Sequence, residues 1–341
     1  FSLLTLSFAS YASRGELERY RLLHDRFSID RYLKYQNPFS EKVFSLDFAG
    51  SSGLKDLLGD VSTATDTGTS IQQEVEITKI LIKNANTEKF LNARVDFMAP
   101  LPSFRLQGIQ FYPQIFTRAD AGLSFSVSNL DDPANPKASL YARKDLLGGF
   151  NLWFEAKKGE SWKTSLYYMQ RADLLEKISA DDIAGDGNIV ELSDLDKNEK
   201  TLRTDLAFHK NKSSYHYLIE LREISLKRFS DHKAKFQRTP LFHTQYTWKN
   251  PLSVFNFSPF VGFHFRNRYA LIEGMYVGGH LNFEDSPFTV MGKLSQDFIS
   301  LTPRYEYGFL HFSYAFKSPV RNPQDDLWVS AIHNINLSVL F

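Results

Sequence analysis

The chain has 341 residues, no cysteine, and a formal net charge of +1 from 40 basic and 39 acidic residues. This balance lacks the clustered basic excess of a nucleic-acid-binding surface, and the missing cysteine excludes disulfides and thiolate metal sites. Aromatic residues make up 15% of the chain while its mean hydropathy is −0.32, so the apolar residues are dispersed and not gathered into runs.

The chain opens with FSLLTLSFASYAS. This stretch is shorter than the roughly 18 consecutive apolar residues of a membrane helix. It fits the apolar middle of a secretory signal followed by small residues. It equally fits a first strand with Leu4, Leu6 and Phe8 on one face, and the sequence leaves both interpretations open.

Helical periodicity appears next. Within residues 14–36, Leu17, Tyr20, Leu23 and Phe27 recur at spacings of three and four, which predicts one or two short amphipathic helices. The following stretch SSGLKDLLGDVSTATDTGTS is rich in Gly, Ser and Thr and is interpreted as a loop. We therefore expect an N-terminal segment over residues 1–70 and one β-domain over residues 71–341.

From about Ile71 onward the apolar period changes to two, as expected for strands with one apolar face. In AGLSFSVSN, for example, Leu123, Phe125 and Val127 alternate with serines. Further strands are predicted at 91–99, 109–118, 150–157, 162–171, 202–209, 215–226, 241–248, 254–266, 269–283, 288–294, 301–316 and 329–341.

An all-β domain with this pattern is either a soluble β-protein or a membrane barrel. Many of the segments run nine residues or more, the length that a tilted strand needs to cross a bilayer. Full charges recur in mid-strand opposite aromatic faces, which favours an antiparallel transmembrane β-barrel with a polar interior. The predicted lumen-facing residues are Arg94, Asp96, Gln110, Gln114, Arg118, Arg203, Asp205, Glu220, Arg222, Arg304 and Glu306. The predicted lipid- or partner-facing residues are Leu123, Phe125, Val127, Phe255, Phe257, Phe263, Phe265 and Phe341.

The end of the chain carries apolar residues at the last, third-last and fifth-last positions: Phe341, Val339 and Leu337. This pattern resembles the signal by which Gram-negative outer-membrane β-barrel proteins are recognised for assembly. The resemblance covers the architecture from about Ile71 to Phe341 and implies a porin-like barrel in the bacterial outer membrane. It also implies the barrel assembly machinery as a partner during biogenesis.

We expect about 14 strands, within a range of 12 to 16, because single-chain bacterial barrels have an even number. One observation conflicts with the strands as predicted. With a periplasmic C-terminus, the loop at residues 317–326 lies outside, but the long acidic stretch 173–200 is then placed on the periplasmic side. Long loops belong on the other side, so at least one strand is miscounted. The suspected regions are 40–50, RNRY (266–269) and SQDFISLTPR (295–304).

Candidate chemistry is sparse. His311 and Ser313 lie two residues apart and share the predicted face of Tyr305 and Tyr307. Outer-membrane lipid hydrolases use such a pair, and Asn322 is this chain's candidate for the orienting group that the pair also needs. Two residues are a weak match, so no enzymatic activity is predicted. The acidic run at Asp181, Asp182 and Asp186 lacks the alternating ligands of a calcium loop, and NPQDD (322–326) is interpreted as a turn. No metal and no cofactor are expected.

Two functions fit this sequence. The first is passage of small solutes across the outer membrane, with residues 14–36 as a plug in a barrel too wide for side chains alone to fill. The second is a structural barrel that packs with copies of itself and organises lipid. Membrane lipid and a homo-oligomer are the expected partners, and nucleic acid is not.

Overall fold

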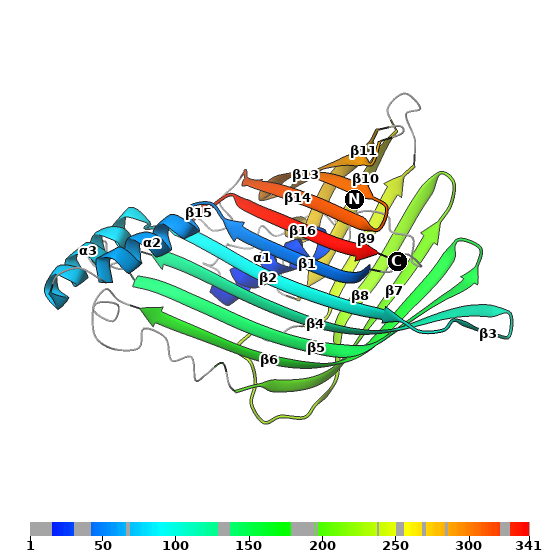
Figure 1. Cartoon of the computed structure of the whole chain (residues 1–341), viewed down its shortest axis with the longest axis horizontal. Coiled ribbons are helices and arrows are strands. Elements are labelled where there is room, and N and C mark those ends of the chain that lie inside the picture. The colour runs from blue at the N-terminus through cyan, green and yellow to red at the C-terminus, as the bar shows by residue number, and fades with distance from the viewer. Residues whose placement is uncertain are drawn as a thin grey trace, which may run out of the picture.

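The computed structural model describes residues 16–30, 42–65, 69–128, 137–178, 195, 197–236, 239–249, 256–267, 271–283, 286–320 and 328–340. Fourteen strands hydrogen-bond in one closed antiparallel ring, in which β1 completes the circle between β2 and β16 (Figure 1). The ring strands are β1 (Lys42–Ser51), β2 (Thr87–Pro100), β4 (Ile109–Ser128), β5 (Lys137–Lys157), β6 (Glu160–Ile178), β7 (Glu199–Asn211), β8 (Tyr215–Arg228), β9 (Leu241–Trp248), β10 (Phe257–Arg266), β11 (Met275–Asn282), β12 (Phe288–Ser295), β13 (Phe298–Tyr307), β14 (Leu310–Pro319) and β16 (Ile332–Leu340). The predicted barrel of about 14 strands is confirmed.

Two short strands and four helices complete the described chain. They are β3 (Phe104–Leu106), β15 (Trp328–Val329), α1 (Glu16–Asp30), α2 (Leu54–Thr65), α3 (Ser70–Lys83) and α5 (Leu271–Gly274). Among the described residues, no helix is long and apolar enough to cross a membrane.

The strand count resolves the conflict over the acidic stretch. Residues 301–316, predicted as one strand, are two strands: β13 ends at Tyr307 and β14 begins at Leu310. The turn between them needs only Gly308 and Phe309, and Gly308 adopts a left-handed backbone with φ 55°. The conflict over the acidic stretch therefore arose in this hairpin. Of the three suspected regions, 40–50 does contain a missed strand, β1, but it precedes the acidic stretch and does not change its side when strands are counted back from the C-terminus. A two-residue turn leaves the apolar alternation almost unbroken, so the sequence pattern did not indicate a turn there.

The connections differ in length at the two ends of the barrel. At one end, the short-turn end, the strands are joined through 101–108, 158–159, 212–214, 249–256, 283–287 and 308–309. At the other end, the long-loop end, they are joined through 52–86, 129–136, 179–198, 229–240, 267–274, 296–297 and 320–331. β16 ends at the short-turn end. The acidic connection and the one at 320–331 thus share the long-loop end, as a bacterial barrel requires.

The expected boundary at residue 71 differs from the structure. β1 belongs to the barrel, since it pairs with β16 from Ser51 back to Lys42. Residues 71–83 are helical, because they form most of α3. Its isoleucines and valine follow a helical period, with Ile77 and Leu81 buried on one face. The stretch interpreted as a loop also contains α2, so α2 and α3 form a helical hairpin between β1 and β2.

This hairpin packs on the outside of the barrel near the long-loop end (Figure 1). Ala64 of α2 and Ile77 and Leu81 of α3 form an apolar cluster with Val127 of β4 and Ala138 of β5. Val127 is fully buried there. The helices therefore cover part of the outward surface that lipid would otherwise meet.

Much of the rest of the described outward surface is apolar and uncovered. Along β1, Leu46 and Phe48 are 42% and 48% exposed. Ser45, Asp47 and Ala49 alternate with them and are buried on the inward face. Large apolar side chains with similar exposure occur along β10, β13, β14 and β16. An apolar exterior around a closed ring of strands matches the solvent properties of a bilayer, because closure leaves no unpaired backbone edge in lipid.

Leu46→Arg tests this assignment. Leu46 lies near the middle of β1, where a charge facing lipid should lower the free energy of unfolding by about 2–4 kcal/mol. Phe309→Arg is the control: Phe309 is 66% exposed in the turn at the short-turn end, where the cost should be about 0–1 kcal/mol. Urea titration in lipid vesicles, read by the gel shift between folded and boiled protein, measures both. Equal costs would contradict a membrane-facing wall.

Candidate functional site

The candidate site is the lumen, and helix α1 lies inside it (Figure 1). From Arg19 to Phe27 every side chain of this helix is buried, charged ones included. A helix of this composition has no apolar stripe broad enough to explain such burial in an ordinary core. It is buried because strands surround it on several sides.

One side of α1 packs against an apolar cluster inside the barrel. Tyr20, Leu23 and Phe27 contact Phe90 of β2, and the Phe27 and Phe90 rings stack with centroids 4.9 Å apart. The other members of the cluster are Ala49, Tyr141, Phe236, Phe298, Val329 and Ile332. The expectation that Leu17, Tyr20, Leu23 and Phe27 face the inner wall agrees with these contacts, with Leu17 at the margin of the cluster.

The last turn of α1 contacts the opposite wall. Ile29 packs with Phe260 of β10, Tyr276 of β11 and Met291 of β12, all three of them buried. The helix therefore touches inward-facing residues of both halves of the ring. Since these contacts lie toward the long-loop end, α1 occludes that half of the lumen.

Charged side chains attach α1 to the wall at separate points. Arg266 of β10 donates two hydrogen bonds to Asp25, at 2.7 and 2.8 Å, and both side chains are essentially inaccessible. Arg19 pairs with Glu88 of β2 at 3.2 Å. Arg26 pairs with Asp297. At the end of the helix, Lys293 of β12 and Lys317 of β14 both pair with Asp30.

Gly122 of β4 makes room for the helix. A Cβ at this position would lie 2.0 Å from the Tyr20 hydroxyl oxygen. The same hydroxyl accepts a hydrogen bond from Arg143 of β5 at 3.2 Å. A residue with any side chain would displace Tyr20, so this glycine permits the close approach of α1 to the wall.

Gly122→Ala should therefore loosen α1. We expect trypsin to cleave within the helix, at Arg19 or Arg21, in the folded variant but not in the wild-type protein. Gly292→Ala is the matched control, because a Cβ at Gly292 would meet nothing within 4 Å. Limited proteolysis followed by mass spectrometry measures the difference, and identical cleavage of the two variants would contradict a positioning role for Gly122.

An arginine and an aspartate two residues apart recur on each of β2, β4, β5, β6 and β7. The pairs are Arg94 and Asp96, Arg118 and Asp120, Arg143 and Asp145, Arg171 and Asp173, and Arg203 and Asp205. The side chains interlock across strands: Arg143 pairs with Asp120 and Asp145, and Arg171 with Asp145. We call this the Arg-x-Asp ladder. Of these residues, the first and last pairs and Arg118 were predicted to face the lumen; the repeated spacing was the signal for the whole set.

All the residues predicted to face the lumen lie on inward faces. Arg94, Asp96 and Arg118 pair with one another, and Gln114 is 1% exposed. Gln110 shares the inward alternation of β4. Asp205 accepts a hydrogen bond from Tyr167, and Arg203 is buried. Glu220 contacts Arg222 and His243. Arg304 and Glu306 line a cavity.

The residues predicted to face outward do so where the structure describes them. Leu123, Phe257, Phe263 and Phe265 are half-buried or exposed on the outer face. Phe125 and Val127 also point outward, but they pack against the α2–α3 hairpin and not against open surroundings. Phe255 and Phe341 lie outside the described residues, as do residues 1–13, Arg14, the acidic run at 181–186 and NPQDD.

His311 and Ser313 share a face, but not the predicted one. The hairpin register sets His311 opposite Glu306 and Ser313 opposite Arg304, so both point into the lumen and away from the face of Tyr305 and Tyr307. His311 Nδ1 lies 3.8 Å from a Glu306 carboxylate oxygen. The Ser313 hydroxyl has no hydrogen-bond partner among the described residues. His311 and Ser313 therefore do not form a histidine–serine pair that faces lipid.

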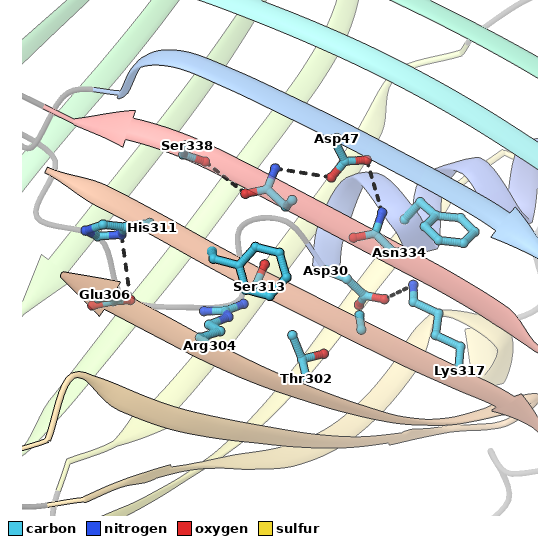
Figure 2. Close-up of a pocket in the computed structure, with 14 residues that line it drawn as sticks. Asp30, Asp47, Thr302, Arg304, Glu306, His311, Ser313, Lys317, Asn334 and Ser338 are labelled. Atoms are coloured by element: carbon cyan, nitrogen blue, oxygen red, sulfur yellow. Dashed lines mark hydrogen bonds and ion pairs between the residues drawn. The ribbon is translucent and has the colours of Figure 1, made fainter.

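Below α1, toward the short-turn end, the lumen holds a polar cavity (Figure 2). Its empty volume is about 670 Å³, which includes the part open to solvent. It is bounded at one end by Phe27 and Asp30 of α1. The wall is formed by Asp47, Thr302, Arg304, Glu306, His311, Phe312, Ser313, Ala315, Lys317, Asn334, Asn336 and Ser338.

A loop also enters the lumen, which the sequence analysis missed. Phe236, in the connection between β8 and β9, is fully buried beside Tyr20, with ring centroids 5.5 Å apart. Its backbone carbonyl accepts a hydrogen bond from Arg171 at 3.0 Å. A single phenylalanine in a polar loop gave no signal of this position.

Within the described chain, no group of three or more His, Asp or Glu side chains could hold a metal ion.

Comparison with known proteins gives structural likenesses alone. No family model and no curated protein matches the chain. The transport unit of the autotransporter AIDA-I from Escherichia coli aligns over 96% of this chain and 99% of its own, at 11% identity and a TM-score of 0.41. A mutant of the Rh. blastica porin aligns over 87% of this chain and 98% of its own, at 8% identity and a TM-score of 0.36. CdiB from Acinetobacter baumannii aligns over 87% of this chain and 59% of its own, at 10% identity and 0.36.

The chain's own strand pairing is what identifies its architecture. The ring is closed, its outer surface is apolar, and its interior carries interlocked charges. Sheets that span a bilayer have these three properties together, because lipid leaves no partner for an open edge. The protein is a transmembrane β-barrel of the kind found in bacterial outer membranes.

Proposed function

We propose that the protein is an outer-membrane channel for small solutes, and that α1 is the plug that closes it. The observation that carries the proposal is the position of α1, which contacts inward-facing residues of β2 on one side and of β10 to β12 on the other. A barrel with 14 strands is wider than the roughly eight strands whose side chains can fill an interior. Its lumen must therefore hold either water or a separate element.

The way α1 is held supports a plug that can be displaced. Its strongest links to the wall are ion pairs such as Asp25 with Arg266, and fully buried ion pairs contribute little net stability because both charges lose their hydration. When the helix leaves, these charges regain water. The Arg-x-Asp ladder, in contrast, pairs its charges within the wall and would keep a polar lining in the open state.

The connection lengths suggest the orientation. Short turns face the periplasm and longer loops face the outside in single-chain bacterial barrels. On that basis α1 occludes the outer half of the lumen, and the polar cavity below it faces the periplasm. The barrel assembly machinery and membrane lipid are the partners this proposal requires.

Planar-bilayer recording tests the proposed function. The full-length chain is compared with a chain that lacks residues 16–30, and the proposal requires far more conductance from the second. A folded barrel that stays closed after the deletion would overturn it.

A second candidate is a structural barrel that packs with copies of itself and organises lipid. The observation in its favour is the α2–α3 hairpin, which extends beside the outer wall and keeps apolar side chains uncovered. Leu58, Ile71, Val75 and Ile82 are 57%, 71%, 48% and 46% exposed. Chemical cross-linking of the purified protein together with analysis of co-purified lipid tests this function. A strictly monomeric protein without retained lipid would exclude it.

A further inference from the structure

In the cavity below α1, Glu306 and Asp30 attract the Arg304 guanidinium electrostatically. Within the described part of the chain, however, this guanidinium makes no hydrogen bond and no ion pair. The same holds for the hydroxyls of Thr302 and Ser313. Arg304 and Ser313 are directly opposite each other on β13 and β14, and Thr302 is the next inward residue on β13. Figure 2 shows the three side chains on neighbouring strands of one wall.

This differs from the rest of the lumen. In the Arg-x-Asp ladder, Arg94, Arg118, Arg143 and Arg171 pair with aspartates, and Arg203 donates hydrogen bonds to the Thr201 hydroxyl and the Glu223 carbonyl. The cavity's second cation, Lys317, is paired with Asp30. A half-buried cation and two nearby hydroxyl donors without hydrogen bonds cost free energy unless water or a ligand accepts from them. Arg304 therefore differs from the ladder arginines and from Lys317.

We propose that this cavity binds a small organic monocarboxylate through Arg304, Thr302 and Ser313. The planar guanidinium presents parallel N–H donors that match the two oxygens of a carboxylate. The hydroxyls of Thr302 and Ser313 donate to the same oxygens from the flanking positions. The inference rests on the proposed function, since the ligand is a solute that the barrel would admit from its periplasmic mouth.

The charges around the cavity select the class of ligand. The carboxyl groups of Asp30, Asp47 and Glu306 also line it. Asp30 is neutralised by two lysines, whereas Asp47 is hydrogen-bonded by the Asn334 amide. One unpaired cation therefore faces a lining that already contains carboxylates. A doubly charged anion is repelled more strongly than a singly charged one, which favours a carboxylate over phosphate.

Ligand-observed NMR on the full-length protein in detergent micelles tests the site. Propionate is the probe, propionamide is its neutral counterpart, and inorganic phosphate represents the dianion. We expect saturable propionate binding, no propionamide binding, and weaker phosphate binding. Arg304→Gln should weaken propionate binding about tenfold or more, because a hydrogen-bonded charge is lost. Arg304→Lys keeps the charge but loses the paired donors, so its propionate affinity should lie between those of the wild-type protein and Arg304→Gln.

Arg118→Gln is the matched control, because it makes the same change of charge on another inward wall, where the arginine pairs with Asp96. It should leave propionate affinity unchanged. Each variant is first shown to fold by its faster migration on an unboiled detergent gel. No saturable propionate binding, equal weakening by both glutamine variants, or tighter binding of phosphate than of propionate would each overturn the proposal. Propionate binding together with a folded α1 deletion that stays closed would uphold this site and overturn the channel; conductance by the α1 deletion without propionate binding would do the reverse.

Discussion

Deleting residues 16–30 should turn a closed barrel into an open one. The full-length chain should show rare or no openings in a planar bilayer, whereas the shortened chain should conduct continuously. The reason is the volume that α1 occupies: from Arg19 to Phe27 its side chains are buried against inward residues of β2 on one side, and Ile29 against those of β10 to β12 on the other. The ring itself closes without the helix, through β1 pairing with β2 and β16.

A deletion of the α2–α3 hairpin is the matched control. Both deletions remove helices of similar length, but this hairpin lies outside the ring. A flexible Gly–Ser linker between Ser51 and Thr87 replaces residues 52–86 and keeps Glu88 and Phe90, which contact α1. Conductance should stay at the full-length level. If the two deletions gave the same conductance, or if the α1 deletion stayed closed while migrating as a folded barrel, the plug assignment would be wrong.

The sequence was sufficient for the barrel architecture and for the alternation of faces within a single strand. Alternation along segments such as residues 121–127 follows directly from the pleat of a strand, because one face meets lipid and the other meets a polar lumen. Inward charges such as Arg94 and Arg222 were therefore predictable from local pattern. Each strand carries this information by itself, without reference to its neighbours.

Features that depend on contacts between distant segments were not predictable. Residues 71–83 were assigned to the strand region because isoleucine and valine favour strands, but their spacing also fits a helix, and packing against Val127 and Ala138 decides the outcome. The turn at Gly308 was missed because two residues barely interrupt the alternation. The position of α1 was only a hypothesis, since its partners Glu88 and Arg266 are far away in sequence.

The candidate site shows the same division. The inward orientation of Arg304 follows from alternation, but its lack of a partner does not. That depends on the hairpin register, which sets Arg304 opposite Ser313 and not opposite an acidic residue. A single-residue shift of the register would place other side chains beside it. The Arg-x-Asp ladder was detectable from spacing alone, although its interlocking needed the alignment of five neighbouring strands.

Arg266→Ala should release the plug without deleting it. In the full-length protein this change leaves the Asp25 carboxylate buried without the arginine that holds it through two hydrogen bonds. Removing one partner of a buried ion pair costs about 3–5 kcal/mol. The helix can avoid this cost by leaving the lumen, because Asp25 then reaches water. Bilayer recordings should therefore show openings that approach those of the α1 deletion.

A double-mutant cycle separates release of the plug from damage to the wall, since Arg266 also pairs with Glu223 of β8 at 3.1 Å. Asp25→Ala leaves that second pair intact and should open the channel less. Urea titration in lipid vesicles then gives the cost of Arg266→Ala with and without α1. A cost several-fold smaller in the shortened chain would locate the effect in the pair with Asp25. If the cost were the same in both chains, Arg266 would stabilise the wall alone and α1 would have to be held by its other contacts. The lysine pair on Asp30 would then be the next to test, because it holds the far end of the helix to β12 and β14.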